Sequence, residues 1–497
     1  MVGVVAVVWL FSLAVVAGVA RQSALSLLIV GATLASSLIR CRGSAWHAVA
    51  LGVTLAGACV AIGWVCAARL AGDGATVERV AAAAGAARVE LRGWVCSFPQ
   101  ATGNGCTFDF ATRLEGRGVT VQVRAEFFDV HYGDEYLLRA RLVRSSRAGM
   151  SYLRSRGLAG SARVRLRDAV RVGGSHGGVL ARGVFWPLHR GTRVHLQRVM
   201  GRDAGLAIGM LLGERAQLGD ATRDAVRRLG ISHLLAISGM HLTSIAGCIV
   251  LATSRCRRWT VPALAAALSV YTGVVGDVES LTRAYVMSLL LMAAHATIRP
   301  VRPLDALAKT LFVMALASPL SMRSVGLQLS FAATFALLAM LPGVRAWWTP
   351  REVRRPFRVL LAIARSVAVA FLISLGVEVF IAPLQLHHFG SLSVVGPVAT
   401  VVFLVPLTAI LLASAPVAAC ATILPVGEWM ARALAAVSTA TIDLIAACGR
   451  LAPAPLRLPE PDPWLYYAGL ALAFRFRRRP LAWVTGAGLM VLAFLRS

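Results

Sequence analysis

The stretch His-Leu-Leu-Ala-Ile-Ser-Gly-Met-His occupies residues 233–241, at the start of a long apolar run. A Ser-Gly step between two histidines is unusual in a segment of membrane-spanning length, because each unsatisfied polar group in hydrocarbon costs several kcal/mol. If the stretch is helical, His233 and His241 lie on one stripe and Ser238 lies on the adjoining edge. Gly239 weakens the helix and lets another backbone approach. The stretch therefore requires polar neighbours or water.

The composition excludes an ordinary soluble enzyme and is typical of a polytopic membrane protein. Of 497 residues, 57% are hydrophobic and only 15% are charged, and the mean hydropathy is +0.70. The net charge of +28 comes from 51 basic and 23 acidic residues, and Lys309 is the only basic residue that is not arginine. Such a balance predicts an anionic partner, either lipid headgroups or nucleic acid.

Three apolar segments long enough to cross a bilayer lie within residues 1–70. Arg40 and Arg42 lie between the second and third segments, and loop arginines favour the cytoplasmic side, so we expect a cytoplasmic N-terminus. The N-terminus has no basic n-region and no clear cleavage site, so we expect the first segment to be retained as a span.

Residues 80–172 form a region of different character, in which the apolar runs give way to alternating, strand-like patterns. Gly and Asn punctuate these patterns, as in Thr-Gly-Asn-Gly at 102–105. We predict a small extracytoplasmic β domain, and we expect the chain to lead back toward the membrane in its last part, residues 144–170. The expected strands cover residues 88–98, 106–113, 118–128 and 135–143.

Two cysteines of this β domain, Cys96 and Cys106, flank its first predicted turn. A hairpin could bring them together in an oxidising compartment, so a disulfide is one interpretation. Two unpaired thiols are the equally weighted alternative.

The β domain also carries an excess of arginine, and its candidate DNA-contacting residues are Arg92, Arg124, Arg139 and Arg141. A small barrel with this excess suits a surface that follows a phosphate backbone. The same excess also matches the arginine bias of the whole chain.

Residues 177–232 mix apolar and charged positions at helical spacing, which predicts amphipathic helices in the outer membrane interface. Residues 233–497 then contain a series of apolar segments whose connecting loops alternate in arginine content. Together with the N-terminal segments they give roughly 13 spans. The expected spans of this region cover residues 233–252, 259–275, 281–298, 304–319, 324–342, 360–382, 392–415, 428–448, 464–474 and 481–495.

Five sequence motifs resemble the signature of the ComEC family, the inner-membrane DNA-uptake channel of natural transformation. They are Leu-Leu-Gly-Glu-Arg at 211–215, Arg-Leu-Gly-Ile-Ser followed by the opening stretch at 228–241, Thr-Arg-Ala at 282–284, Gly-Leu-Gln-Leu-Ser-Phe at 326–331 and Ala-Pro-Leu-Gln-Leu-His-His-Phe-Gly at 382–390. The resemblance implies a polytopic α-helical membrane protein with an inserted small extracytoplasmic β (OB-like) domain. Residues 233–497 are then the competence-type transmembrane channel domain.

The sequence departs from the family pattern in two places. Many members continue into a metallo-β-lactamase-like domain with an HxHxDH cluster, whereas this sequence ends at Ser497 and has no HxH. It also has Val-Ala-Thr at 398–400 where the family usually has an Asn. We therefore expect a protein that is not an enzyme, with no catalytic residue, no bound metal and no cofactor.

The resemblance places a set of polar residues of the channel domain along a translocation path. Ionisable and polar groups inside a membrane are functional by default. For each, helix packing, capping or ion pairing is the structural alternative. The candidate path residues are His233, Ser238, Gly239, His241, Arg283, Gln328, Ser330, Glu378, Gln385 and His388.

Two other function classes stay open from the sequence. Ser238 close to a histidine is reminiscent of an intramembrane serine hydrolase, although the local His241 follows on the same segment. A small-molecule or lipid transporter is the stronger rival, although the two halves show no inverted repeat.

The resemblance implies that the protein translocates single-stranded DNA across the inner membrane into the cytoplasm. No phosphate-binding loop of the Walker type occurs in the sequence, so we expect a separate cytoplasmic ATPase motor. Membrane lipids, an extracytoplasmic DNA receptor and a nuclease acting in trans are the other expected partners.

Overall fold

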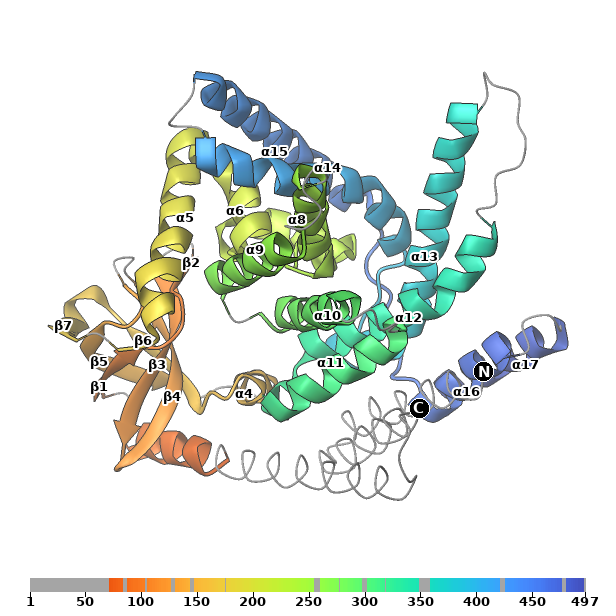
Figure 1. Ribbon diagram of the computed structural model, residues 1–497. Coiled ribbons are helices and arrows are strands. Elements are labelled where there is room, and N and C mark those ends of the chain that lie inside the picture. The colour runs from red at the N-terminus through yellow and green to blue at the C-terminus, as the bar shows by residue number, and fades with distance from the viewer. Residues whose placement is uncertain are drawn as a thin grey trace.

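The structure is a computed structural model that joins a β-barrel to a larger helical body (Figure 1). The three spans expected within residues 1–70 lie outside the described residues. The structure describes residues 71–83, 87–102, 105–126, 130–143, 147–174, 176–253, 260–276, 278–296, 302–317, 319–347, 358–420, 425–475 and 480–495.

The barrel is a closed ring of strands in the order β1, β3, β4, β6 and β5, and β5 pairs back with β1. The pairing of β4 with β6 is parallel, and the other pairings of the ring are antiparallel. Two further strands extend the sheet, since β2 pairs with β3 and β7 pairs with β5. The strands are β1 (Val89–Val95), β2 (Gln100–Thr102), β3 (Gly105–Leu114), β4 (Arg117–Ala125), β5 (Glu135–Val143), β6 (Gly160–Val164) and β7 (Ala169–Gly173).

Alternation of side chains along each strand fills the barrel interior. Phe108 and Phe110 of β3 point inward with Val121 and Val123 of β4, and each is at most 2% exposed. The intervening residues face outward, as expected for a strand with a period of two. The alternation predicted from the sequence is thus confirmed for β1, β3, β4 and β5.

The expectation that residues 144–170 lead back to the membrane is wrong. They form helix α4 (Arg147–Ser155), the strand β6 and the beginning of β7. The strand β6 closes the ring because it lies between β4 and β5. Its five residues contain only two strand-typical apolar side chains, Ala162 and Val164, beside Arg163, and they pair over a long sequence separation, so no local pattern marks the strand.

The sequence left two interpretations open for Cys96 and Cys106, and the structure does not form a disulfide between them. The strand register explains this, because Cys96 donates its backbone N–H to Asp109 whereas Cys106 pairs with Ala101 and Ala125. Asp109 and Cys106 are three residues apart on one strand, or roughly 10 Å. A disulfide requires Cα atoms within about 7 Å.

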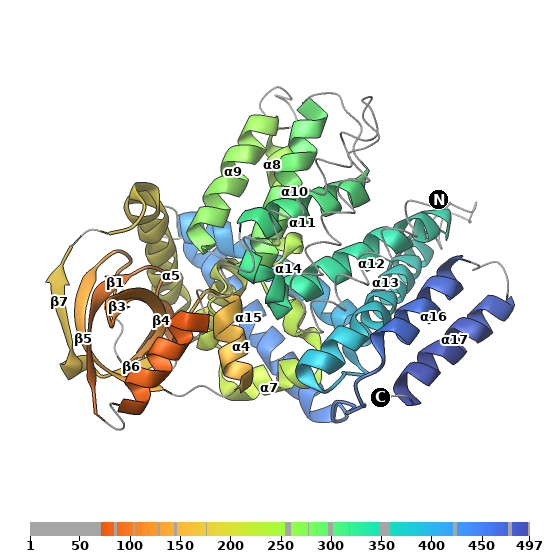
Figure 2. The same ribbon diagram turned by 90° about the horizontal axis from the view of Figure 1, so that it is seen from below.

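The helices of the body from α9 onward overlap the apolar segments expected from the sequence, and Figure 2 shows their arrangement. Within the part of the chain that the structure describes, three helical segments are long and apolar enough to cross a bilayer, namely Ala362–Phe389, Gly396–Ala418 and Gly427–Leu451, and these support a membrane protein. The helices are α5 (Trp186–Met200), α6 (Ala204–Leu212), α7 (Asp220–Arg228), α8 (Gly239–Ala252), α9 (Thr260–Val275), α10 (Glu279–Ala296), α11 (Pro303–Ala317), α12 (Val325–Trp347), α13 (Arg358–Phe389), α14 (Gly396–Cys420), α15 (Pro425–Leu451), α16 (Pro463–Arg475) and α17 (Pro480–Leu495).

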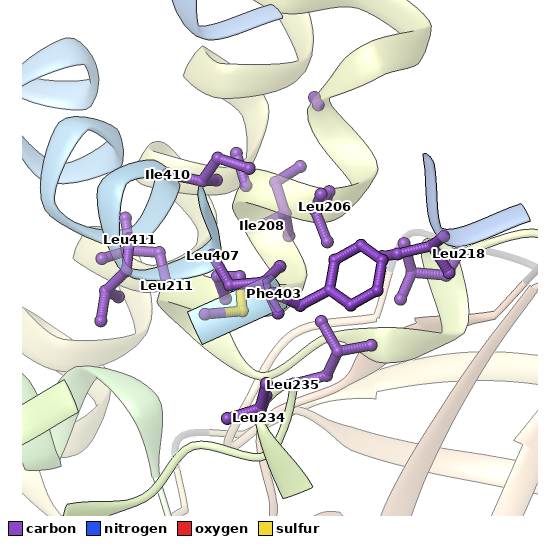
Figure 3. Packing of buried hydrophobic residues seen from close by; sticks show 14 of the residues in the cluster. Leu206, Ile208, Leu211, Leu218, Leu234, Leu235, Phe403, Leu407, Ile410 and Leu411 are labelled. Carbon is purple, nitrogen blue, oxygen red and sulfur yellow. The ribbon is translucent and has the colours of Figure 1, made fainter. Parts of the chain in front are cut away.

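Helix α6 lies at the centre of the largest apolar core, which differs from the expected interfacial position. Leu206, Ile208 and Met210 are fully buried. Figure 3 shows Leu206 and Ile208 facing Phe403 and Leu407 of α14. A helix that is apolar on all sides belongs in a core rather than at an interface.

A substitution at Gly93 of β1 tests how closely β1 and β3 approach each other in the barrel. A Cβ at this position would lie 2.0 Å from the carbonyl oxygen of Ala111. We expect Gly93→Ala to destabilise the barrel by roughly 1–3 kcal/mol, because overpacking forces backbone shifts. The matched control is Gly118→Ala in β4, where a Cβ meets nothing within 4 Å. Thermal unfolding of the purified chains in maltoside micelles measures both, and equal melting temperatures would contradict the strand register.

Candidate functional site

The Ser-Gly step of residues 238–239 is the beginning of a helix. Ser238 is the N-cap of α8 and has an extended backbone conformation, with φ −142° and ψ −177°. Its Oγ accepts the Met240 N–H at 3.3 Å, and His241 Nδ1 accepts the Ser238 N–H at 3.2 Å. These two bonds satisfy helix-start donors that would otherwise be unpaired. The polarity of the step therefore has a local structural role.

This cap overturns the expectation that residues 233–241 form one helix with a histidine stripe. His233 belongs to the short 3₁₀ turn Ile231–His233, and its Nδ1 lies 3.1 Å from the carbonyl oxygen of Gly230. His241 is fully buried, and its Nε2 has no hydrogen-bond partner among the described residues. The two histidines therefore do not share a face.

Four of the predicted path residues come together where α8, α10 and α12 meet. Arg283 of α10 donates from Nε to Ser330 Oγ of α12 at 2.9 Å. A Cβ placed on Gly239 would lie 3.5 Å from Arg283 Nη2, and Ser238 caps the same helix start. The side chain of Arg283 is buried, with 6% exposure. We call Ser238, Gly239, Arg283 and Ser330 the arginine cluster.

Gln328 and His388 form a second polar contact between α12 and α13. His388 Nε2 lies 2.9 Å from Gln328 Oε1, and Gln328 Nε2 donates to the carbonyl oxygen of Met322 at 3.1 Å. Gln328 and Ser330 are two residues apart on α12, so they point to nearly opposite sides of the helix. The structure therefore places this pair outside the arginine cluster.

Glu378, Gln385 and His233 lie toward the beginning of α14. Gln385 lies close enough to Glu378 within α13 to influence its carboxyl group. A Cβ on Gly396 would lie 3.9 Å from Glu378 Oε1. His233 Nε2 is 3.5 Å from Thr400 Oγ1. The predicted path residues thus fall into separate groups rather than one continuous line.

A buried ionic network that the sequence did not reveal lies between α5 and the segment after α6. Glu214 Oε1 contacts His189 Nε2 at 2.9 Å and Arg193 Nη1 at 3.3 Å. Gln217 Nε2 donates to Glu214 Oε2 at 2.9 Å, and His189 Nδ1 donates to the carbonyl oxygen of Val274 at 2.8 Å. The motif at 211–215 contains this glutamate, but its histidine partner lies far earlier in the sequence.

The same network adjoins the barrel through an aromatic cluster. Phe98, which follows β1, lies 5.5 Å from the ring of Trp186 and 5.5 Å from the ring of His189. Tyr132 meets Phe98 edge to face at 5.3 Å. Aromatic pairs at these distances are favourable beyond their buried area. This contact joins the barrel to α5.

The four predicted arginines of the barrel divide into two kinds. Arg92 and Arg139 form surface ion pairs of 2.9 Å with Glu135 and Glu90. The hydrogen bond from Arg92 lowers the pKa of the Glu135 carboxyl, and burial opposes this shift. These two arginines are therefore partly neutralised.

Arg124 and Arg141 flank a third arginine on neighbouring strands. Arg163 of β6 pairs with Arg124 on one side and with Arg141 on the other, and all three are exposed. None forms an ion pair with a described residue. We call Arg124, Arg163 and Arg141 the arginine row. Arg163 was not among the predicted arginines, because no local sequence pattern indicates β6.

The geometry of Ser238 does not match an activated serine nucleophile. Its hydroxyl accepts the Met240 N–H, whereas His241 accepts the Ser238 backbone N–H instead of contacting the hydroxyl. Nucleophile and base side chains need a direct hydrogen bond. Within the described residues there is also no group of three His, Cys, Asp or Glu side chains that could hold a metal ion.

Comparisons with known proteins agree on one family. A family model described as "Competence protein" matches residues 210–480, which is more than half of the chain. ComE operon protein 3 of Bacillus subtilis (strain 168) is 26% identical over 196 residues, or 39% of this chain. The match covers 23% of the length of that protein. No solved structure matches the chain.

Removal of Glu214 tests the buried ionic network. Glu214→Ala would leave His189 and Arg193 buried without their carboxylate partner, so we expect the free energy of unfolding to fall by about 3 kcal/mol or more. The control is Glu428→Ala, which removes an exposed partner of Arg432 at 3.4 Å and should cost under about 1 kcal/mol. Thermal unfolding in micelles compares the two. Similar losses for both variants would show that the network is not stabilising.

Proposed function

Because the chain belongs to the Competence protein family, also called the ComEC family, we propose that it translocates single-stranded DNA across the inner membrane during natural transformation. The protein would be a multi-pass channel with a cytoplasmic N-terminus and an extracytoplasmic barrel. The family match covers residues 210–480, which include the helices that contain the arginine cluster.

The observation that carries this proposal is the arginine cluster inside an apolar helical body. Polar and ionisable groups within a membrane are expensive, so they mark functional paths by default. A polyanion requires cationic or hydrogen-bonding groups along its route. Arg283 and Ser330 supply both kinds of group within the segment that matches the family.

The barrel suits a role in guiding the incoming strand, and we assign it to the OB-like class. The five strands of its closed ring are, in chain order, β1, β3, β4, β5 and β6. The first of these strands pairs with the fourth, and the third pairs with the fifth. OB barrels bind oligonucleotides on their outer faces and loops. Like charges directly opposite on neighbouring strands are destabilising, so the arginine row favours an anionic partner.

The remaining partners follow from the direction of transport. We assign the driving force to a separate cytoplasmic ATPase, the delivery of DNA to an extracytoplasmic receptor and strand degradation to a nuclease acting in trans. The chain itself acts as a channel rather than as an enzyme, and it needs no cofactor for this role.

DNA uptake by a deletion strain tests the proposed function directly. In a host shown to be transformable, deletion of the gene should abolish entry of labelled DNA into the cytoplasm, while binding of DNA at the cell surface persists. Reintroduction of the gene should restore entry. A deletion strain that internalises DNA at the wild-type rate would refute the proposal.

Gly239→Leu tests whether the beginning of α8 must stay open. A Cβ at Gly239 already lies 3.7 Å from Ala284 Cβ, so the rest of a leucine side chain would fill the space beside Arg283. We expect uptake to fall at least tenfold while the protein still accumulates in the membrane. Gly247→Leu on the same helix is the control, because a Cβ there meets nothing within 4 Å. Equal uptake by both variants would show that the space is not needed.

A further inference from the structure

Arg283 is a buried cation without a counter-charge among the described residues. Its guanidinium donates to Ser330 Oγ and lies 5.7 Å from the centre of the Phe331 ring. These contacts orient the side chain, but neither supplies a negative charge. No carboxylate in the described part of the chain lies within ion-pair distance of it. An uncompensated buried charge is strongly destabilising unless an anion occupies the site.

The beginnings of three helices lie around this guanidinium. Helix α8 begins at Gly239, α10 begins at Glu279 and α12 begins at Val325. Arg283 lies on the second turn of α10, and Ser330 lies on the second turn of α12. The N-terminal end of a helix carries a partial positive charge. The partial charges of these helix ends therefore have the same sign as the charge of Arg283 and do not cancel it.

Glu279 is the acidic residue of the first turn of α10. A Cβ on Gly326 would lie 3.3 Å from Glu279 Oε2, so this carboxylate faces the beginning of α12. Its charge acts on Arg156, and no ion pair joins it to Arg283. Arg283 therefore keeps its charge available for a bound anion.

The cap of α8 leaves one backbone donor beside the arginine. The N–H groups of Ser238 and Met240 are bonded to His241 and Ser238, and the His241 N–H bonds to the Ser238 carbonyl at 3.1 Å. The Gly239 N–H has no acceptor among the described residues. Ser330 Oγ accepts from Arg283, so its own hydrogen remains available for donation.

We propose that Arg283, the Gly239 amide and the Ser330 hydroxyl bind one phosphodiester group of a single-stranded nucleic acid. A guanidinium with neutral donors matches the single negative charge of a diester. Helix N-termini are general anion sites, and transporters use them for anionic substrates. This inference rests on the proposed function, and it specifies which part of the DNA the arginine cluster contacts.

The salt dependence of binding distinguishes a phosphate contact from a purely structural arginine. Full-length protein in maltoside micelles is titrated with a fluorescent oligothymidine between 50 and 300 mM NaCl, with the affinity read by fluorescence anisotropy. Loss of one phosphate contact lowers the slope of log K against log salt by about 0.7 for a single strand. We expect this reduction, with a several-fold weaker affinity, for Arg283→Gln.

Three further measurements complete the test. Arg450→Gln, which removes an exposed arginine at the end of α15, should keep the wild-type slope. Arg283→Lys should keep the slope but bind more weakly, because an ammonium cannot bond Ser330 and a phosphate in the same geometry. A methylphosphonate oligonucleotide, which lacks backbone charge, should bind wild type and Arg283→Gln equally.

The outcomes separate this site from the proposed function. An unchanged slope for Arg283→Gln, with wild type binding DNA normally, would overturn the phosphate site alone. Failure of wild type to bind or import DNA would instead refute the proposed function. Native mass spectrometry provides a further outcome: a phospholipid retained by wild type but lost from Arg283→Gln would assign the site to a lipid headgroup and overturn the nucleic-acid assignment.

Discussion

A guanidinium enclosed by apolar helices is the constraint on which the functional part of this fold depends. Arg283 is held by Ser330 and Phe331, and the first turn of α8 lies against it. Burial without a carboxylate makes a charge costly, and nearby helix N-termini increase that cost. In the proposed phosphate site, an anion beside Arg283 offsets this cost. Helices α8, α10 and α12 therefore meet at a position suited to a passing polyanion.

The barrel is positioned against the helical body by a separate set of interactions. Phe98 packs on Trp186 and His189, and His189 in turn contacts the buried Glu214. An ionic network that is fully enclosed holds its members in one arrangement, because each polar atom loses its partner if the helices move. Because Phe98 packs on Trp186 and His189, the aromatic cluster also fixes the position of the barrel against α5. The arginine row is consequently presented on a domain with a defined placement rather than on a loose appendage.

Local patterns were sufficient for most of the elements. Alternation marked the strands that contain Phe108 and Val121, and continuous apolar runs marked the helices from α9 onward. The strand β6 was not predicted, because its parallel pairing with β4 joins segments that are far apart in the sequence. Strand register separates Cys96 from Cys106, whose pairing the sequence left open. The histidine stripe was wrong for a related reason, because a helix cap decides which residues face each other.

The sequence by itself determined the membrane character, the division into β and helical regions, the family and the identity of Arg283 and Ser330 as polar residues in apolar surroundings. These follow from composition, periodicity and short motifs, which act over neighbouring residues. Only the tertiary structure decided that Ser238 is a cap, that α6 lies in the core and that Arg283 meets Gly239 without a carboxylate partner among the described residues. Those facts depend on contacts between helices far apart in the chain, where packing and electrostatics, rather than local preference, select the arrangement.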